Sequence, residues 1–183
     1  MLHQNSQKRY YIPGSVYFIT INTFNKFSYF KQEILCELFI DDLKICKKLK
    51  QFELLGFCLL FDHIHLLIQP NDGYNISQIM ESLKGNSSRN INKIIGFSWV
   101  EGDPTLGRLR LFRNNFINKY GIDKSTLPIF KWQKSFHDHI IRNDKDLVNH
   151  YNYTVYNFKK HNLPDNWKYT SLNYQELIDE NKI

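Results

Sequence analysis

Residues 52–69 read FELLGFCLLFDHIHLLIQ, two apolar runs separated only by the polar step at Asp62-His63. Short apolar runs that are bounded by turn residues are typical of buried strands, and the brief interval between these two predicts a β-hairpin. Residues 70–73 (PNDG) are turn formers and end the second strand.

The segments around this hairpin predict the rest of one domain, residues 1–183. Strands are expected at 16–23 and within 130–141, and helices at 32–50, at 76–95 and from Asp144 or Asp146 to about His161. The connection 97–128 stays unassigned, and 171–183 is an acidic tail. The order of elements predicts an α+β fold: a ferredoxin-like antiparallel sheet with helices packed on one face.

Composition narrows the class of protein. Hydrophobic residues make up 42% of the 183 residues and aromatic residues 15%, which excludes a disordered chain. No apolar run is long enough to span a bilayer, and the N-terminus lacks the apolar core of a signal peptide. We therefore expect a cytoplasmic protein without a membrane partner. The three cysteines form no CxxC pair, so buried free thiols in a reducing compartment are expected.

The charge balance is basic. The formal net charge is +6 and the pI is about 9.1, although the tail is acidic. A basic body is compatible with a nucleic-acid partner. Because many other soluble proteins are equally basic, charge alone does not select that partner.

The segment His63-Ile64-His65 carries the strongest chemical signal. Successive side chains of a strand point to opposite faces, so the two histidines share one face with their backbones about 7 Å apart. Two imidazoles at that spacing can converge on one cation. The alternative is a pair of half-exposed histidines at a hairpin end that bond only to backbone. Two ligands are too few for a structural zinc site.

The predicted helix at 144–161 carries the second signal. One stripe, predicted to face the core, contains Leu147, Tyr151, Val155 and Phe158; a second contains Asp146, His150, Tyr153 and Asn157. Tyr153 and Asn157 are one turn apart, so Asn157 could be a third ligand with a phenol beside it. The alternative is that Tyr153 is an ordinary interfacial aromatic side chain.

Four segments together resemble a known family: GFCLLFDHIHLLIQP (56–70), ISQIMESLKGNSSRNIN (76–92), FKWQKSFHDHIIRNDKDLVNHYNYTVYNFKKHNLP (130–164) and WKYTSL (167–172). In that order they resemble the single-tyrosine HUH transposases, and within them the REP-associated tyrosine transposases, relatives of the insertion-sequence-200-like group. The similarity covers residues 10–172.

The resemblance implies a role for each matching residue. His63 and His65 match the metal-binding histidines of the HUH motif, Tyr153 matches the nucleophile, and Asn157 matches the polar residue that completes the metal shell. The implied activity is cleavage and rejoining of single-stranded DNA at hairpin-associated sites through a 5′-phosphotyrosine. Mixed imidazole and amide ligands suit Mn²⁺ or Mg²⁺ as the cofactor. His150, one turn from Tyr153, is a possible assisting base.

The chain departs from the family pattern at several positions. Phe158 stands where the family usually has proline, His161-Asn162 replaces a small residue and glycine, and the 97–128 connection is longer than in short members. Tyr151 and Tyr156 are rival nucleophiles. Tyr153 is preferred because Tyr151 lies in the core stripe and Tyr156 is turned away from Asn157.

The expected partner is single-stranded or hairpin DNA, bound by a monomer or a homodimer. Candidate phosphate contacts are Lys8, Arg9, Lys84, Arg89, Lys93, Arg108, Arg110, Arg113 and Lys131, and candidate stacking faces are Tyr10, Tyr11, Trp132 and Phe136. Two other functions stay open: a hairpin-binding regulator that has lost cleavage, and a metal-dependent hydrolase that uses water.

Overall fold

The computed structural model describes residues 9–99, 102, 106–121 and 127–179. Its centre is a four-stranded antiparallel sheet with strand order β2-β3-β1-β4. The strands are β1 (Tyr17–Asn22), β2 (Glu53–Leu59), β3 (His63–Gln69) and β4 (His137–Ile140). This order, with a helix after β1 and another after β3, confirms the ferredoxin-like α+β prediction.

Alternation along the strands divides the sheet into two chemically different faces. Ile19 and Ile21 of β1 and Ile64 and Leu66 of β3 are fully buried and belong to the main hydrophobic core. The residues between them, including His63 and His65, point to the other face. Because a strand has a period of two, the apolar face fixes where the histidines go.

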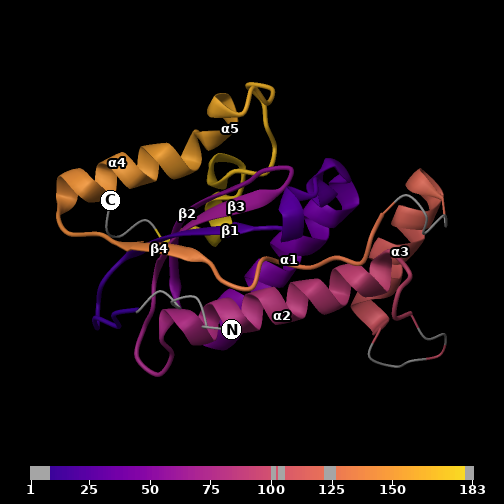
Figure 1. The fold of residues 1–183 in the computed structure, drawn as a ribbon, viewed down its shortest axis with the longest axis horizontal. Helices are drawn as coiled ribbons and strands as arrows, with labels where there is room; N and C mark the ends of the chain where they lie inside the picture. Colours follow the sequence, from indigo (N-terminus) through magenta and orange to yellow (C-terminus); the bar gives the residue numbers. More distant parts are fainter. Residues whose placement is uncertain (1–8, 100–101, 103–105, 122–126, 180–183) are drawn as a thin grey trace, which may run out of the picture.

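Two helices cover the apolar face. They are α1 (Glu33–Lys50) and α2 (Ile76–Ile94), and each buries one apolar stripe. Asn75 caps α2. Its side-chain oxygen accepts a hydrogen bond from the backbone N–H of Gln78, and the side-chain oxygen of Gln78 accepts one from the backbone N–H of Asn75. A further helix, α3 (Gly107–Tyr120), lies beyond α2 within the connection that the sequence left unassigned (Figure 1).

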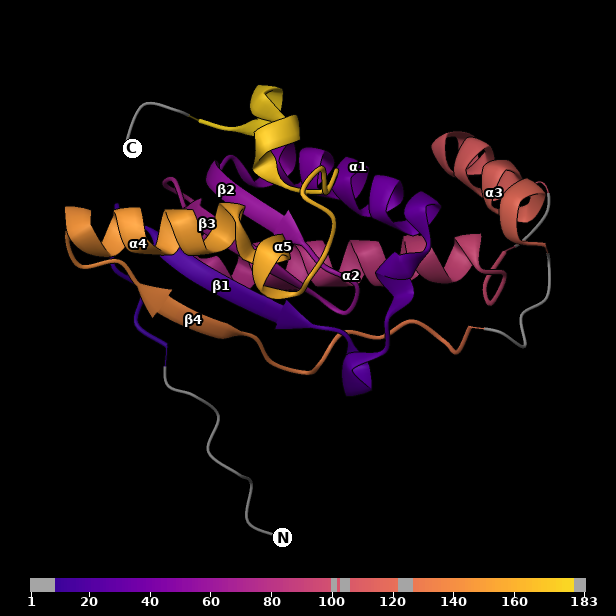
Figure 2. The ribbon, with the colours of Figure 1, turned by 90° about the horizontal axis from the view of Figure 1, so that it is seen from above.

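The opposite face is covered too, which the sequence did not predict. Figures 1 and 2 show α4 (Asp144–Val155) across this face, followed by the short α5 (Asn157–Lys160). The helix contacts β2 at Gly56, where a Cβ would lie at ordinary van der Waals distances of 3.5 Å from Val155 and 3.6 Å from the Tyr151 ring. The helices therefore form two layers, with the histidine face of the sheet under α4.

Two predicted elements are shorter or broken in the structure. In the 130–141 region only β4 is regular, although Trp132 forms an isolated bridge to Thr23. The predicted 144–161 helix breaks at Tyr156, whose backbone (φ −102°, ψ 14°) separates α4 from α5. Among the helices of the described residues, none is both long and apolar enough to cross a bilayer.

Candidate active site

His63 and His65 stand side by side on β3, with ring centroids 4.9 Å apart. Both are almost fully buried under α4 and α5. Nδ1 of His63 donates to the Asp62 carboxylate at 2.6 Å, and Nδ1 of His65 lies 2.8 Å from the Thr20 hydroxyl. A partner on Nδ1 orients an imidazole and leaves Nε2 as the nitrogen for a cation. The arrangement suits two ligands of one ion.

Burial lowers the pKa of both histidines. The pKa of His65 falls to about 3, first through desolvation and then through electrostatic repulsion between its protonated form and the neighbouring imidazoles of His63 and His161. The pKa of His63 is also lowered by burial, against the opposing effect of Asp62. Neutral imidazoles keep the lone pairs that metal binding requires.

Tyr153 on α4 lies directly over this pair. Its ring meets the His65 ring edge-on, with centroids 5.3 Å apart, and meets Phe18 of β1 at 5.6 Å. The ammonium of Lys160 on α5 is 4.2 Å from the centroid of the Tyr153 ring. Tyr153 remains 39% exposed, so a substrate from solvent can reach it.

Asn157 is the most unusual polar residue of the site. It is 1% exposed, and neither its amide oxygen nor its amide nitrogen has a hydrogen-bond partner within the described chain. It lies close enough to His65 to raise the pKa of that imidazole slightly, although no well-formed hydrogen bond joins them. A buried amide without a partner is costly. Its oxygen beside two imidazole nitrogens is a donor set that fits a divalent cation.

Three neighbours of this site were not predicted from the sequence. Thr20 lies directly opposite His65 in the sheet, and the His161 ring is 4.9 Å from the His63 ring. Lys160 completes the group. Helical spacing could have suggested Lys160, about two turns after Tyr153, but the pairing of Thr20 with His65 depends on strand register.

The rival tyrosines point elsewhere. Tyr151 packs against the backbone at Gly56 in β2. Tyr156 is exposed beside Lys159, whose ammonium is 5.5 Å from its ring. His150, the expected assisting base, directs Nδ1 to Asp146 of its own helix and contacts Phe18. The Tyr153 ring, by contrast, contacts His65 of the pair.

Several candidate DNA contacts have partners inside the protein. Arg9 pairs with Asp138 and stacks on Phe136. Lys84 donates to the carbonyls of Gln133 and Lys134. Two more tie helices together: Arg108 of α3 pairs with Asp41 and Asp42 of α1, and Arg113 donates to the Lys93 and Ile94 carbonyls at the end of α2. Arg89, Arg110 and Lys131 are exposed, Lys93 is half-buried, and Lys8 lies outside the described residues.

Two of the predicted stacking faces are wrong. Trp132 is 7% exposed and donates its indole N–H to Ser87 inside the core, and Phe136 is equally buried. Both belong to the hydrophobic core, so neither offers a face to a base. Their spacing in an irregular segment gave no signal of burial. Tyr10 and Tyr11 are exposed, as predicted.

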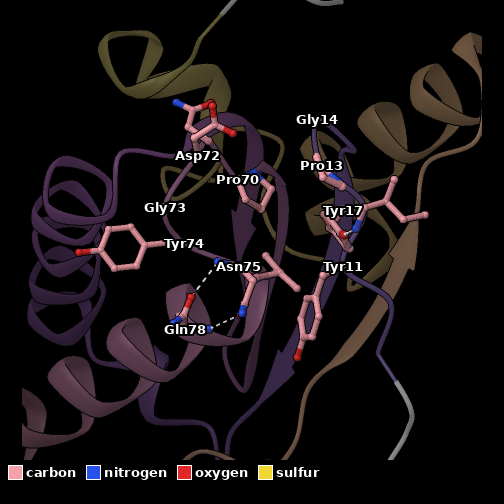
Figure 3. A pocket seen from close by; sticks show the side chains of 13 residues that line it. Tyr11, Pro13, Gly14, Tyr17, Pro70, Asp72, Gly73, Tyr74, Asn75 and Gln78 are labelled. Carbon is pink, nitrogen blue, oxygen red and sulfur yellow. Dashed lines mark hydrogen bonds between the residues drawn. The ribbon is translucent and has the colours of Figure 1, made fainter.

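Tyr11 borders a hollow at the start of α2. Figure 3 shows Tyr11 and Tyr74 on opposite sides of it, with Asn75 and Gln78 between them. Tyr11 is held there by a 2.9 Å hydrogen bond to Ser77. Aromatic rings beside polar amides are the surface that an unpaired base can use.

Comparison with known proteins agrees with this architecture. The family model described as "Transposase IS200 like" matches residues 15–98. The chain is 30% identical over 174 residues to a protein of Haemophilus influenzae that carries the name REP-associated tyrosine transposase, covering 91% of this chain and 85% of that protein.

A solved structure has the same fold. It is that of a REP-associated tyrosine transposase bound to a REP hairpin, with a TM-score of 0.62 and 20% identity over 98% of this chain and 92% of the other. The likeness supports the ferredoxin-like arrangement of sheet and helices. Together with the sequence match over most of both chains, it establishes that this protein belongs to the REP-associated tyrosine transposases of the IS200-like group.

Proposed function

We propose that this protein cleaves and rejoins single-stranded DNA beside hairpins, with Tyr153 as the nucleophile and a divalent cation as cofactor. The observation that carries the proposal is the contact of the Tyr153 ring with His65, next to the buried and unpartnered Asn157. Membership of the transposase family supports the reaction class.

His63, His65 and Asn157 would hold the cation, and Mn²⁺ or Mg²⁺ fits their mixed nitrogen and oxygen donors. A bound divalent cation supplies Lewis-acid neutralisation of the charge that protects a phosphodiester from nucleophiles. The protein contributes the orientation of both imidazoles, through Asp62 and Thr20. Burial lowers the pKa of both rings and so disfavours the protonation that would compete with a cation.

Tyr153 attacks the scissile phosphorus through its phenol oxygen. The P–O3′ bond breaks, the phenol proton is lost to solvent, and the departing oxygen takes up a proton to become a 3′-OH. The 5′ phosphate stays on the tyrosine, so a later attack by a 3′-OH rejoins strands without another energy source. The Lys160 ammonium, 4.2 Å from the ring centroid, favours the negative charge that develops on the phenol oxygen.

The proposed site is complete within one chain. α4 brings Tyr153 onto the histidines of its own sheet, so cleavage needs no tyrosine from a second copy. A homodimer would then serve to hold two DNA ends rather than to assemble each site. Sedimentation with and without DNA measures the state of assembly directly.

DNA is proposed to reach the open side of Tyr153 on the α4 side of the sheet. On the other side it would reach the exposed basic residues Arg89 of α2 and Arg110 of α3, and Lys131 in the segment before β4. Their charges would bind phosphates regardless of sequence. The hollow beside Tyr11 and Tyr74 is a place for an unpaired base next to a hairpin. The alternative of a non-catalytic hairpin-binding regulator uses the same surface but forms no covalent bond.

Trapping a covalent adduct tests the proposal. Wild-type protein, a labelled hairpin oligonucleotide with single-stranded flanks and Mn²⁺ should give a protein–DNA band on a denaturing gel. Tyr153→Phe should bind the oligonucleotide and give no such band, while Tyr156→Phe serves as the matched control and should retain it. EDTA or His63→Ala should also abolish the band. An undiminished adduct from Tyr153→Phe would exclude this nucleophile, and no adduct from the wild type would favour the regulator.

A further inference from the structure

A second group of metal-ligating side chains lies between β4 and α4. His139 on β4, and Asp146 and His150 on α4, each place a ligand atom within 4.8 Å of the others. Oδ2 of Asp146 is 2.9 Å from Nε2 of His139, and Oδ1 is 2.9 Å from Nδ1 of His150. The two imidazole rings are stacked, with centroids 4.5 Å apart and planes 16° from parallel.

The local fold holds the Asp146 carboxylate in place before any ion binds. Asn143 caps α4 by accepting from the Asp146 amide, and the Arg142 amide donates to Oδ2 of Asp146 at 3.0 Å. The hydrogen bond from His139 keeps the pKa of Asp146 low, so the group is an anion at neutral pH. All three side chains are partly exposed, so ions in solution reach them.

We propose that His139, Asp146 and His150 bind a divalent transition-metal ion of the zinc class, independently of any cation at His63 and His65. Two imidazoles and one carboxylate are a donor set that zinc, cobalt and nickel share, and three protein ligands leave a fourth position for water. Bonds of about 2.1 Å in a tetrahedral site place ligand atoms roughly 3.4 Å apart. Each histidine lies 2.9 Å from a different oxygen of Asp146, and one ligand atom from each residue lies within 4.8 Å of the others, so an ion would bind after a small rearrangement of these side chains.

Such an ion would join β4 to the helix that carries Tyr153. The His150 ring contacts Phe18 at 4.9 Å, and Phe18 in turn stacks on His65 at 5.4 Å and meets Tyr153 at 5.6 Å. Binding would therefore hold the middle of α4 against the sheet at the point where Tyr153 emerges. The competing explanation is a hydrogen-bonded clamp that never takes an ion.

Zinc stoichiometry separates the two explanations. Full-length protein stripped with EDTA is titrated with Zn²⁺ by calorimetry, with Co²⁺ absorption as the spectroscopic check. Wild type should bind two ions per chain. His139→Ala should bind one, and the double variant His63→Ala/His65→Ala should also bind one. Adding His139→Ala to the double variant should remove that remaining ion. His137→Ala, a surface histidine on the same strand, is the control and should bind two.

The outcomes distinguish this site from the proposed active site. Stoichiometry unchanged by His139→Ala, or no binding to His63→Ala/His65→Ala, would overturn the second site. One ion in the wild type, lost only with His139→Ala, would support the second site and contradict metal binding at the histidine pair.

Thermal unfolding adds a second readout, with Asp146→Asn as a variant that keeps the shape and the hydrogen bond from Arg142. Zn²⁺ should raise the Tm of His63→Ala/His65→Ala, since ligands that bind only the native state stabilise it. It should leave the Tm of Asp146→Asn/His63→Ala/His65→Ala unchanged. An equal rise in both variants would show that the carboxylate is not a ligand.

Discussion

The Thr20 hydroxyl lies 2.8 Å from Nδ1 of His65, and the two residues are direct partners across the β1–β3 pair. For Nε2 of His65 to offer a lone pair to a cation, Nδ1 must carry the proton and donate it to Thr20. The hydroxyl can accept that proton, so a single side chain on the neighbouring strand is positioned to orient the ring of a proposed metal ligand.

Removing that hydroxyl should weaken metal binding without removing a ligand. Thr20→Val keeps the branched shape and should lower the affinity for Mn²⁺ by about 10- to 100-fold, as measured by calorimetry. Thr154→Val is the matched control, because the Thr154 hydroxyl is buried on α4 and has no partner in the described chain. Equal affinities in Thr20→Val and wild type would mean that Thr20 does not orient the ring.

Asn157 should show a conflict between stability and function. Asn157→Leu replaces two buried polar atoms that lack partners, so the EDTA-treated variant should be more stable than the wild type by about 1 kcal/mol. The same variant should lose the stabilisation that Mn²⁺ gives to the wild type. Asn157→Asp should do the reverse, with an apoprotein destabilised by a buried charge and rescued by the cation. If the Asn157→Leu apoprotein were less stable than the wild type, the Asn157 amide would have to form hydrogen bonds in the native protein, contrary to the structure.

The metal-free protein should lose stability in mild acid through His65. The unfolded chain takes up a proton on this imidazole near pH 6.5, whereas the folded chain, with a pKa of about 3, does not. The unfolded state therefore binds more protons between these values, and stability falls as the pH is lowered from 6.5 toward 3, by at most about 1.4 kcal/mol per pH unit for one group. Urea unfolding in EDTA should show that the free energy of unfolding of His65→Gln depends less steeply on pH than that of the wild type. Parallel plots of stability against pH would mean that His65 is not the group responsible.

The cysteines should be inert in the native protein. All three are buried as free thiols, as the sequence predicted. Burial raises the pKa of Cys46 to about 11 and of Cys58 to about 12, and raises that of Cys36 as well, so almost no thiolate exists at pH 8. A thiol-specific chromogenic disulfide should label no cysteine in native buffer and three in guanidinium. Rapid native labelling of any of them would show that its helix or strand opens readily.

Local patterns in the sequence determined a large part of this protein. The period of two along 63–69 is enough to put both histidines on one face, because neighbouring residues alone decide which way a strand side chain points. Helical spacing likewise put Tyr151 and Tyr153 on different sides of their helix, Tyr151 toward the core and Tyr153 in the stripe that contains Asn157. The order of elements was sufficient for a ferredoxin-like sheet, since few topologies join these elements with short connections.

The tertiary structure decided what depends on residues far apart in the chain. The Thr20 contact requires a strand register, the burial of Trp132 requires the core around it, and the break at Tyr156 arises where α4 ends above the sheet. His139 and Asp146 become neighbours only when β4 and α4 fold against each other. Periodicity is a property of adjacent residues, whereas these contacts form only when separate elements pack together. For that reason the residues of the candidate site could be predicted from the sequence, whereas the contacts that orient them could be identified only from the fold.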